Sequence, residues 1–333
     1  MLMAFRIYPH FGEEDFVHST QVYRPRFTGA GGALFTIHFK NFLLTLITLG
    51  IYAFWGRAEV RRYLYAQTEF AGDRFTFHGT GNEMLRGWFR AIGLVLVCVI
   101  VSVVVTLLFA EALGVLTFYA VLFFVLLPFA LVGSRKYRLS RTSWRGIRFS
   151  FREAARDFLA IYLPGAVLSV ITLGLYFPYF HANVRRFFVN GTLFGTARFQ
   201  FDGQGGDVIG RHLLNLLLLI PTLGIHSFWF AAFRHRYYWE HTSIGGARFR
   251  STVTGGALAG LRITNLLLLI VTLGIAYPWV QARTIQFHAD NLAVHGDAGF
   301  EQVLQDAVSS TATGEEMSEL LDVEMIGADF FGL

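Results

Sequence analysis

An apolar phrase that ends in Thr-Leu-Gly recurs along the chain, and this repetition restricts the possible folds more than any other feature. The phrase reads NFLLTLITLGIY from Asn41, NLLLLIPTLGIH from Asn215 and NLLLLIVTLGIA from Asn265, with a weaker copy, GAVLSVITLGLY, from Gly165. Its glycines are Gly50, Gly174, Gly224 and Gly274, of which the last three are 50 residues apart. Regular internal spacing of this size is typical of chains built from one repeated supersecondary unit.

A second marker, a glycine followed closely by Arg-Phe, supports the same division. It ends at Phe75, Phe149, Phe199 and Phe249, and a weaker version, GDAGF, ends at Phe300. Successive phenylalanines are 74, 50, 50 and 51 residues apart. We therefore predict five units between a soluble N-terminal segment and an acidic tail. The predicted boundaries are 1–26 for the segment, 27–80, 81–150, 151–203, 204–254 and 255–300 for the units, and 301–333 for the tail.

The second unit contains two long apolar runs, 91–109 and 112–133, with Glu111 between them. Each is close to the roughly 20 residues that cross about 30 Å of hydrocarbon as a helix. The whole chain of 333 residues is 54% hydrophobic and 15% charged, whereas soluble domains carry about 25% charged residues. The first 30 residues contain no long apolar core, so we expect membrane insertion to depend on internal spans.

The apolar runs of the other units are shorter, and their topology is open. The charged residues that bound them leave 16 residues between Lys40 and Arg57, 22 between Arg211 and Arg234, and 20 between Arg262 and Arg283. Each run is a single span with a kink at the glycine, a span followed by an interfacial helix, or a helical hairpin with its tip at the glycine. The linkers 57–90, 135–156, 185–211 and 234–262 all carry excess Arg, which favours the cytoplasm. Paired crossings keep every linker on one side, so the bias favours hairpins over six single spans.

Each unit closes with a short alternating stretch around a glycine turn, such as TEFAGDRFTFHG (68–79) or GTLFGTARFQFDG (191–203). This pattern predicts a small β-hairpin. Two strands alone are marginally stable, so we expect neighbouring hairpins to pair or to rest against the helices. The predicted fold is an all-α polytopic membrane protein. It consists of five tandem helical-hairpin or broken-helix units of about 50 residues, with small β-hairpins between them.

The stretch FTGAGGALFTIHFKNFLLTLITLGIYAFWGRAEVRRYLYAQTEFAGDRFTFHGT (27–80), with its later echoes, resembles the YjgN-like family of bacterial inner-membrane proteins. The resemblance covers roughly residues 20–300. It implies a multi-pass protein of the inner membrane whose function is unknown, and it supplies no catalytic residue. The chain departs from the pattern at Gly165, which replaces the asparagine, at Pro221 before Thr222, and in the acidic tail.

Asparagines and threonines of the repeated phrase form a predicted polar set in the membrane interior. The set consists of Asn41, Asn215, Asn265, Thr48, Thr172, Thr222 and Thr272. The asparagines either bond helices to one another or line a shared polar cavity. The threonines are expected to bond to the preceding helical turn and to ease a bend. Gly50, Gly174, Gly224 and Gly274 are the expected helix breaks.

Basic residues near the apolar runs are candidate contacts for anions or lipid headgroups. They are Lys40, Arg57, Arg61, Arg62, Arg185, Arg186 and Arg236. Arg suits bidentate contact with phosphate. The alternative is an interfacial salt bridge, for which Glu59 and Arg62 have suitable helical spacing.

Sequence motifs of catalysis and cofactor binding are absent. There is no phosphate-binding loop, dinucleotide fingerprint, nucleophile elbow or HExxH sequence, and one cysteine, Cys98, excludes a disulfide within the chain. We expect no enzyme activity, metal, cofactor or nucleic-acid partner. The expected partners are membrane lipids. The acidic segment 301–333 is either a solubilising terminus or a docking segment for a protein partner or for the chain's own basic face.

Two functions remain open. The first is a transporter or channel for a small solute, because repeated broken helices with polar interior residues occur in transporters. The second is a non-transporting membrane scaffold or lipid-binding protein, in which basic hairpins hold anionic headgroups.

Overall fold

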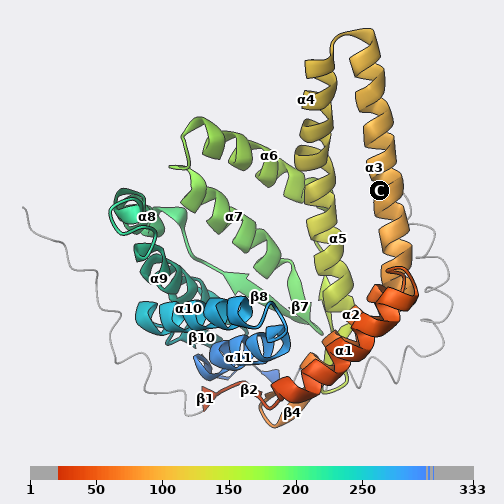
Figure 1. Cartoon of the computed structure of the whole chain (residues 1–333). Coiled ribbons are helices and arrows are strands. Elements are labelled where there is room, and N and C mark those ends of the chain that lie inside the picture. Colours follow the sequence, from red (N-terminus) through yellow and green to blue (C-terminus); the bar gives the residue numbers. More distant parts are fainter. Residues whose placement is uncertain (1–21, 298, 301–302, 304–333) are drawn as a thin grey trace, which may run out of the picture.

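The computed structural model describes residues 22–297, 299–300 and 303. Pairs of helices alternate with pairs of strands along the chain (Figure 1). The helices are α1 (Gly31–Ile47), α2 (Ala53–Ala66), α3 (Gly81–Leu108), α4 (Glu111–Val121), the π-helical turn η2 (Leu122–Leu126), α5 (Leu127–Ser140), α6 (Ala155–Ile171), α7 (Phe177–Asn190), α8 (Gly205–Leu219), α9 (His226–Glu240), α10 (Gly255–Val271) and α11 (Tyr277–Asp290). The strands are β1 (Val22–Tyr23), β2 (Arg26–Phe27), β3 (Thr68–Phe70), β4 (Asp73–Phe77), β5 (Thr142–Trp144), β6 (Ile147–Phe151), β7 (Thr192–Phe194), β8 (Ala197–Phe201), β9 (Thr242–Ile244), β10 (Ala247–Ser251) and β11 (Leu292–His295).

Within the described residues the strands form one antiparallel sheet of eleven, in the order β1-β11-β10-β9-β8-β7-β6-β5-β4-β3-β2. The second strand of one hairpin pairs with the first strand of the next. Phe75 lies opposite Trp144, Phe149 opposite Phe194, and Phe199 opposite Ile244. The hairpins therefore pair with one another, which supplies the backbone partners that an isolated hairpin lacks.

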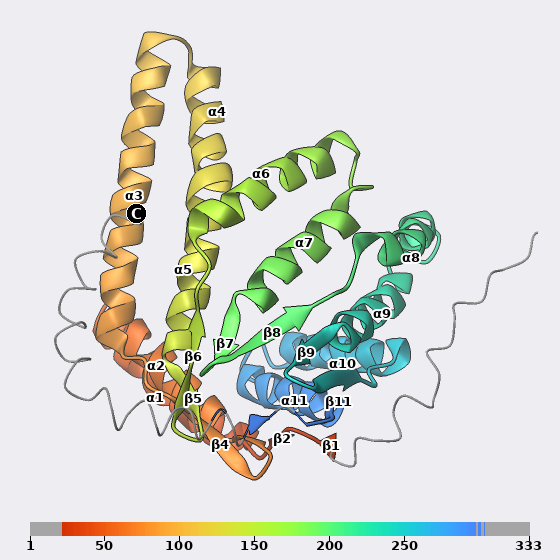
Figure 2. The ribbon, with the colours of Figure 1, turned by 180° about the vertical axis from the view of Figure 1, so that it is seen from behind.

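The two edge strands of the sheet, β1 and β2, are neighbours in the sequence. Only Arg24 and Pro25 separate Tyr23 from Arg26. The edges of the sheet must consequently lie close together, so the sheet curls round on itself (Figures 1 and 2). The N-terminal strand β1 pairs with β11, the last strand described. The first and the last described strands therefore pair with each other.

The Thr-Leu-Gly phrase forms the tight turn of a helical hairpin. Leu49 and Gly50 both take positive φ values, 51° and 95°, and the three later copies repeat this pair. The Thr48 hydroxyl donates to the carbonyl of Leu44 at 2.7 Å and accepts from the amide of Tyr52 at 3.0 Å. Thr172, Thr222 and Thr272 make the same two bonds. The threonine thus ends the first helix and holds the start of the second.

Consecutive hairpins are joined by an aromatic residue that packs on a glycine. Trp55 lies against Gly81, Tyr179 against Gly205, and Trp229 against Gly255, in each case at the first residue of the following helix. A Cβ at any of these glycines would overlap the aromatic residue. The glycines of the polar turns are therefore packing positions, where the next helix approaches closely.

The prediction of an all-α polytopic membrane protein is wrong. An eleven-stranded curled sheet organises the part of the chain that the structure describes. Among those residues, two continuous helices are long and apolar enough to cross a membrane, Gly81–Leu108 and Glu111–Ser140. The apolar runs of the other units are divided between helices of 14–17 residues. Such helices are shorter than the roughly 20 residues that a span needs.

The two long helices form a hairpin that projects beyond the other helices (Figure 1). In their most apolar windows 6% and 11% of residues are buried, whereas the core helix of a soluble protein is mostly covered. Small residues bring the two helices together: Ser102 Oγ donates to the carbonyl of Gly114 at 2.7 Å, and a Cβ at Gly114 would meet Thr106. Close contact through small residues is typical of helix pairs in membranes.

The Arg-rich linkers all contribute strands to the same sheet. Arg74 lies in β4 and Arg248 in β10. One continuous sheet cannot lie on both sides of a bilayer, because a bilayer tolerates no open sheet within it. The linkers are therefore parts of one continuous sheet, and their side of the membrane stays a prediction.

Candidate functional site

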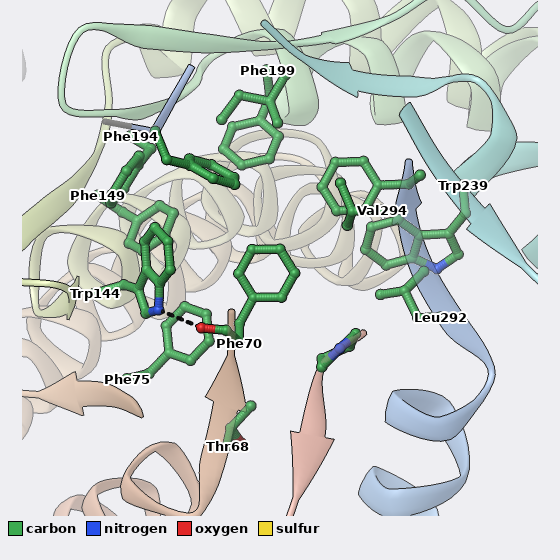
Figure 3. Close-up of a pocket in the computed structure, with 14 residues that line it drawn as sticks. Thr68, Phe70, Phe75, Trp144, Phe149, Phe194, Phe199, Trp239, Leu292 and Val294 are labelled. Atoms are coloured by element: carbon green, nitrogen blue, oxygen red, sulfur yellow. Dashed lines mark hydrogen bonds between the residues drawn. The ribbon is translucent and has the colours of Figure 1, made fainter. Parts of the chain in front are cut away.

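The inner side of the curled sheet lines a partly open apolar pocket of about 310 Å³, which we call the aromatic pocket (Figure 3). Strands β3 to β11 all contribute side chains to it. Its lining consists of Pro25, Thr68, Phe70, Phe75, Trp144, Phe149, Phe194, Phe199, Trp239, Ile244, Phe249, Leu292, Val294 and Phe300. Its rings form two contacting groups: Phe194 lies 4.9 Å from Phe149 and 5.4 Å from Trp144, and Phe249 lies 6.2 Å from Phe199 and 5.3 Å from Trp239.

The phenylalanines of the Gly-Arg-Phe marker all line this pocket. Phe75, Phe149, Phe199 and Phe249 lie on the second strand of successive hairpins, and Phe300 lies beyond β11. Because side chains alternate along a strand, the arginine before each phenylalanine faces the other way. Those arginines, Arg74, Arg148, Arg198 and Arg248, are exposed. The marker thus has an apolar inner residue and a charged outer one.

The indole nitrogens of the aromatic pocket are satisfied within the protein, and that of Trp239 donates to His235 Nε2 at 3.2 Å. The indole Nε1 of Trp144 donates to the carbonyl of Phe70 at 3.1 Å (Figure 3) and lies 3.3 Å from that of Asp73. The lining therefore suits apolar and aromatic groups and offers little to a polar solute.

A second pocket of about 200 Å³, the basic pocket, adjoins the first. Its lining residues are Tyr65, Phe75, Arg135, Arg138, Leu139, Thr142 and Phe149, so Phe75 and Phe149 belong to both pockets. Arg135 Nη2 donates to the hydroxyl of Thr192 at 3.3 Å, and its buried Nε has no hydrogen-bond partner among the described residues. An apolar space and a cationic space thus share one aromatic wall.

Two further arginines lie beside these pockets. Arg185 stands over the rings of Phe201, Tyr238 and Trp239 at 5.7, 5.1 and 5.3 Å, and Trp239 also lines the aromatic pocket. Burial lowers the pKa of Arg185 to about 10, where the opposing effect of Tyr238, which raises it, and the effect of Arg135, which lowers it, are both included. Burial also lowers the pKa of Arg61, with Arg138 as a second cause.

Among residues 22–297, 299–300 and 303, no carboxylate forms an ion pair with Arg61, Arg135, Arg138 or Arg185. The cation–π contacts of Arg185 offset part of the cost of burial. A buried charge without a counterion remains unfavourable. These four arginines, which we call the basic cluster, are therefore chemically suited to bind an anion, because arginine binds phosphate and carboxylate groups in a bidentate manner.

Histidines near the cluster do not add to its charge at neutral pH. His235 stacks on His288 at 5.0 Å and lies 3.0 Å from the Ser251 hydroxyl. Burial, followed by the neighbouring His288, Arg185 and Arg236, lowers the pKa of His235 to about 4. The positive charge of the site is consequently carried by arginine.

The asparagines of the predicted polar set are buried, and each bonds within its own helical hairpin. Asn41 Nδ2 donates to the carbonyl of Gly56 at 3.4 Å, Asn215 Oδ1 lies 3.3 Å from His226 Nδ1, and Asn265 Nδ2 donates to Thr284 at 3.1 Å. The threonines and glycines of the set form the hairpin turns described above. These contacts join the two helices of one unit.

The predicted basic contacts divide into three groups. Arg62, Arg186 and Arg236 donate to the carbonyls of Gly79, Gly203 and Val253, and so fix the linker that follows each hairpin. Lys40 pairs with Glu59, and Arg57 stands over Phe54 at 5.7 Å. Arg61 and Arg185 belong to the basic cluster. Arg135 and Arg138 were not predicted, although they occupy the corresponding helix of the second unit.

The aromatic pocket was also not predicted. The regular spacing of the marker phenylalanines was the available signal, but spacing does not reveal that the strands close around one space. No group of three or more metal-ligating side chains occurs in the described part of the chain. The acidic tail from residue 304 onward lies outside the described residues.

The fold and the site define a protein in which a hairpin of two long apolar helices, which we call the two-helix anchor, projects from a curled sheet with an apolar interior. The family described as "Bacterial protein of unknown function (DUF898)" matches residues 22–215, 196–249 and 230–320, and the chain belongs to this family. The resemblance to YjgN-like proteins is confirmed by the curated relatives.

Two of these relatives are both named inner membrane protein YjgN. The protein of Salmonella typhimurium strain LT2 is 32% identical over 161 residues, which cover 45% of this chain and 39% of the relative. That of Escherichia coli strain K12 is 35% identical over 154 residues, which cover 45% and 36%. The alignments thus span less than half the length of these relatives. Their names support an inner-membrane location for this chain. No solved structure matches it.

Proposed function

We propose that the chain is a lipid-binding protein of the inner membrane that holds an anionic amphiphile on the cytoplasmic side. One observation carries the proposal: the aromatic pocket and the basic pocket share Phe75 and Phe149. An apolar group in the first pocket would place an attached anionic group near Arg135 and Arg138. The Arg-rich sheet would be cytoplasmic, as the charge bias of membrane proteins favours.

The size of the aromatic pocket limits what can enter it. Ligand pockets are usually about 300–1,000 Å³, so about 310 Å³ lies at the small end of this range. The pocket suits a segment of a hydrocarbon chain or a small ring system, with the rest of the amphiphile outside. The anionic group would supply the counterion that the basic cluster lacks among the described residues.

Transport of a small solute has less support. A shared polar cavity lined by Asn41, Asn215 and Asn265 would favour it, but each of these side chains is engaged within its own hairpin. The partly open space at the centre of the sheet has an apolar lining.

The proposal is tested by native mass spectrometry of the full chain released from detergent micelles. Phosphatidylglycerol and phosphatidylcholine with identical acyl chains are the probes. We expect the protein to retain phosphatidylglycerol more strongly. A variant with Arg135→Gln and Arg185→Gln should weaken this preference at least about tenfold, because a hydrogen bond to a charged group contributes about 1.5–3 kcal/mol.

Two further variants separate the pockets from general surface charge. Ile244→Trp fills the aromatic pocket and should reduce retention of both lipids, while Arg248→Gln, on the exposed outer face, should change neither. Each variant is first checked for a cooperative melting transition above the assay temperature, which shows that it is folded. If the folded double-arginine and Ile244→Trp variants retain phosphatidylglycerol as the parent does, the pockets do not bind it.

A further inference from the structure

The four short helical hairpins carry a leucine at the apex that is almost fully exposed. The exposed fractions are 93% for Leu49, 89% for Leu173, 90% for Leu223 and 91% for Leu273. Each of these leucines has a φ between 49° and 51°. An apolar side chain in this position contributes nothing to the interior of the protein.

The left-handed backbone conformation makes the choice of leucine informative. Glycine and asparagine adopt positive φ more readily than a bulky residue, and a polar residue would suit a water-exposed turn. The chain places leucine there in four separate turns. Exposure of an apolar side chain at such a strained turn carries no hydrophobic penalty where the surrounding medium is itself apolar.

The residues around each apex enlarge the apolar surface. A second residue of each turn is also highly exposed. Ile47 (76%), Ile171 (70%) and Val271 (80%) directly precede the threonine, and Ile220 (82%) precedes Pro221. Together with the apical leucine this second residue forms what we call a leucine tip. Contiguous exposed apolar surface of this kind marks contact with a membrane or a partner.

The distance from each leucine tip to the next charged side chain sets the depth of the apolar part. On the second helix of the hairpins, Arg57, Arg185, Arg234 and Arg283 follow the apical leucine by 8, 12, 11 and 10 residues. At about 1.5 Å per residue this is roughly 12–18 Å. The hydrocarbon core of a bilayer is about 30 Å thick. The tips are therefore long enough to enter one leaflet and too short to cross both.

The two-helix anchor identifies the apolar medium. Helix α2 of the α1–α2 hairpin packs against α3, and α6 of the α6–α7 hairpin packs against α5. These two hairpins therefore adjoin the long helices of the two-helix anchor directly. The helical hairpins extend outward from the sheet, and the anchor reaches furthest (Figures 1 and 2). A bilayer that surrounds the anchor is the nearest apolar phase to the tips.

We propose that the leucine tips of the four short hairpins insert into the leaflet of the bilayer that faces the sheet, around the two-helix anchor. The partner is the acyl-chain region of that leaflet. This inference does not depend on the proposed lipid-binding pockets, because the tips share no residue with them.

The experiment uses the full chain reconstituted into phosphatidylcholine and phosphatidylglycerol vesicles. Single cysteines are placed at Leu223 or Leu273 in a Cys98→Ala background and labelled with an environment-sensitive fluorophore. Arg248→Cys, on the exposed face of the sheet, is the matched control. Vesicles with bromine atoms on the acyl chains quench a label that lies among those chains, whereas iodide quenches a label in water.

We expect brominated chains to quench both tip labels at least several-fold more than the control label, and iodide to quench the control alone. The proposal is overturned if iodide reaches the tips as it reaches the control. It is also overturned if neither quencher acts on them, which would indicate that the tips are covered by protein, such as a second copy of the chain. A variant that does not reconstitute is replaced by its equivalent at Leu49 or Leu173.

Discussion

Trp279 packs directly on Gly31, and this contact joins the last described helix to the first. A Cβ at Gly31 would lie 2.7 Å from the indole Cγ and 3.0 Å from the Cα of Trp279. The same ring lies 5.1 Å from Phe35, and His38 Nε2 is 3.2 Å from Gln281 Oε1. The contact repeats what Trp55 does at Gly81, but here it connects residues at opposite ends of the chain. The helices thereby close a ring around the curled sheet.

Gly31→Ala is expected to destabilise the protein by about 1–3 kcal/mol, because the added methyl group overpacks the contact with Trp279. The matched control is Gly32→Ala, since a Cβ at Gly32 meets nothing within 4 Å. That substitution should be neutral or slightly stabilising, because alanine has a higher helix propensity than glycine. Melting temperatures of both variants in the same detergent give the comparison. Equal melting temperatures would show that the closed ring of helices does not depend on the contact between Gly31 and Trp279.

Phe194→Ala is expected to cost about 3–5 kcal/mol, the usual range for removing a buried phenylalanine. Phe194 is 1% exposed and contacts Trp144, Phe149 and Phe300 around the aromatic pocket. Arg198→Ala, on the outer face of the neighbouring strand, should cost at most about 1 kcal/mol, because its ion pair with Glu153 is partly exposed. Thermal unfolding of the two variants measures the difference. A destabilisation well below this range would mean that neighbouring side chains relax into the space that the phenylalanine ring leaves.

Lowering the pH from 7 towards 4 is expected to destabilise the folded protein through His235. Its pKa is lowered from 6.5 to about 4, so between these values the unfolded chain binds more protons than the folded one. Stability therefore rises with pH across this window and is unaffected by His235 above it. The groups that face it are His288, Arg185 and Arg236. His235→Asn should make the melting temperature less dependent on pH between 7 and 5. An unchanged slope would exclude His235 as the titrating group.

Asn265 and Thr284 are expected to stabilise the last hairpin through their mutual hydrogen bond. Asn265→Ala and Thr284→Val should each cost about 1 kcal/mol, the usual contribution of a polar contact between helices in membranes. The double variant should cost clearly less than the two single changes added together, because both remove the same bond. Strict additivity in the unfolding measurements would show that the two side chains act separately.

Several features of this protein follow from the sequence alone. Apolar runs of about 20 residues identify the two-helix anchor, because crossing a bilayer is a requirement on length and composition. Thr48, Leu49 and Gly50 specify their turn locally, since the threonine hydroxyl bonds to the helix before it and glycine tolerates positive φ. The alternation around Phe75 identifies a strand with one apolar face.

The tertiary structure decided what those elements pack against. Alternation shows that Phe75 and Phe149 have an inner face, but not that Phe75 opposes Trp144 in a neighbouring hairpin or that the strands line one pocket. The ring closure at Gly31 and Trp279 and the gathering of Arg135 and Arg185 likewise join residues far apart in the chain. Which strands pair in which register, and which residues meet in the interior, depend on such distant partners and leave no local signal. This is also why apolar runs that a tight turn divides into short helices were predicted to cross the membrane.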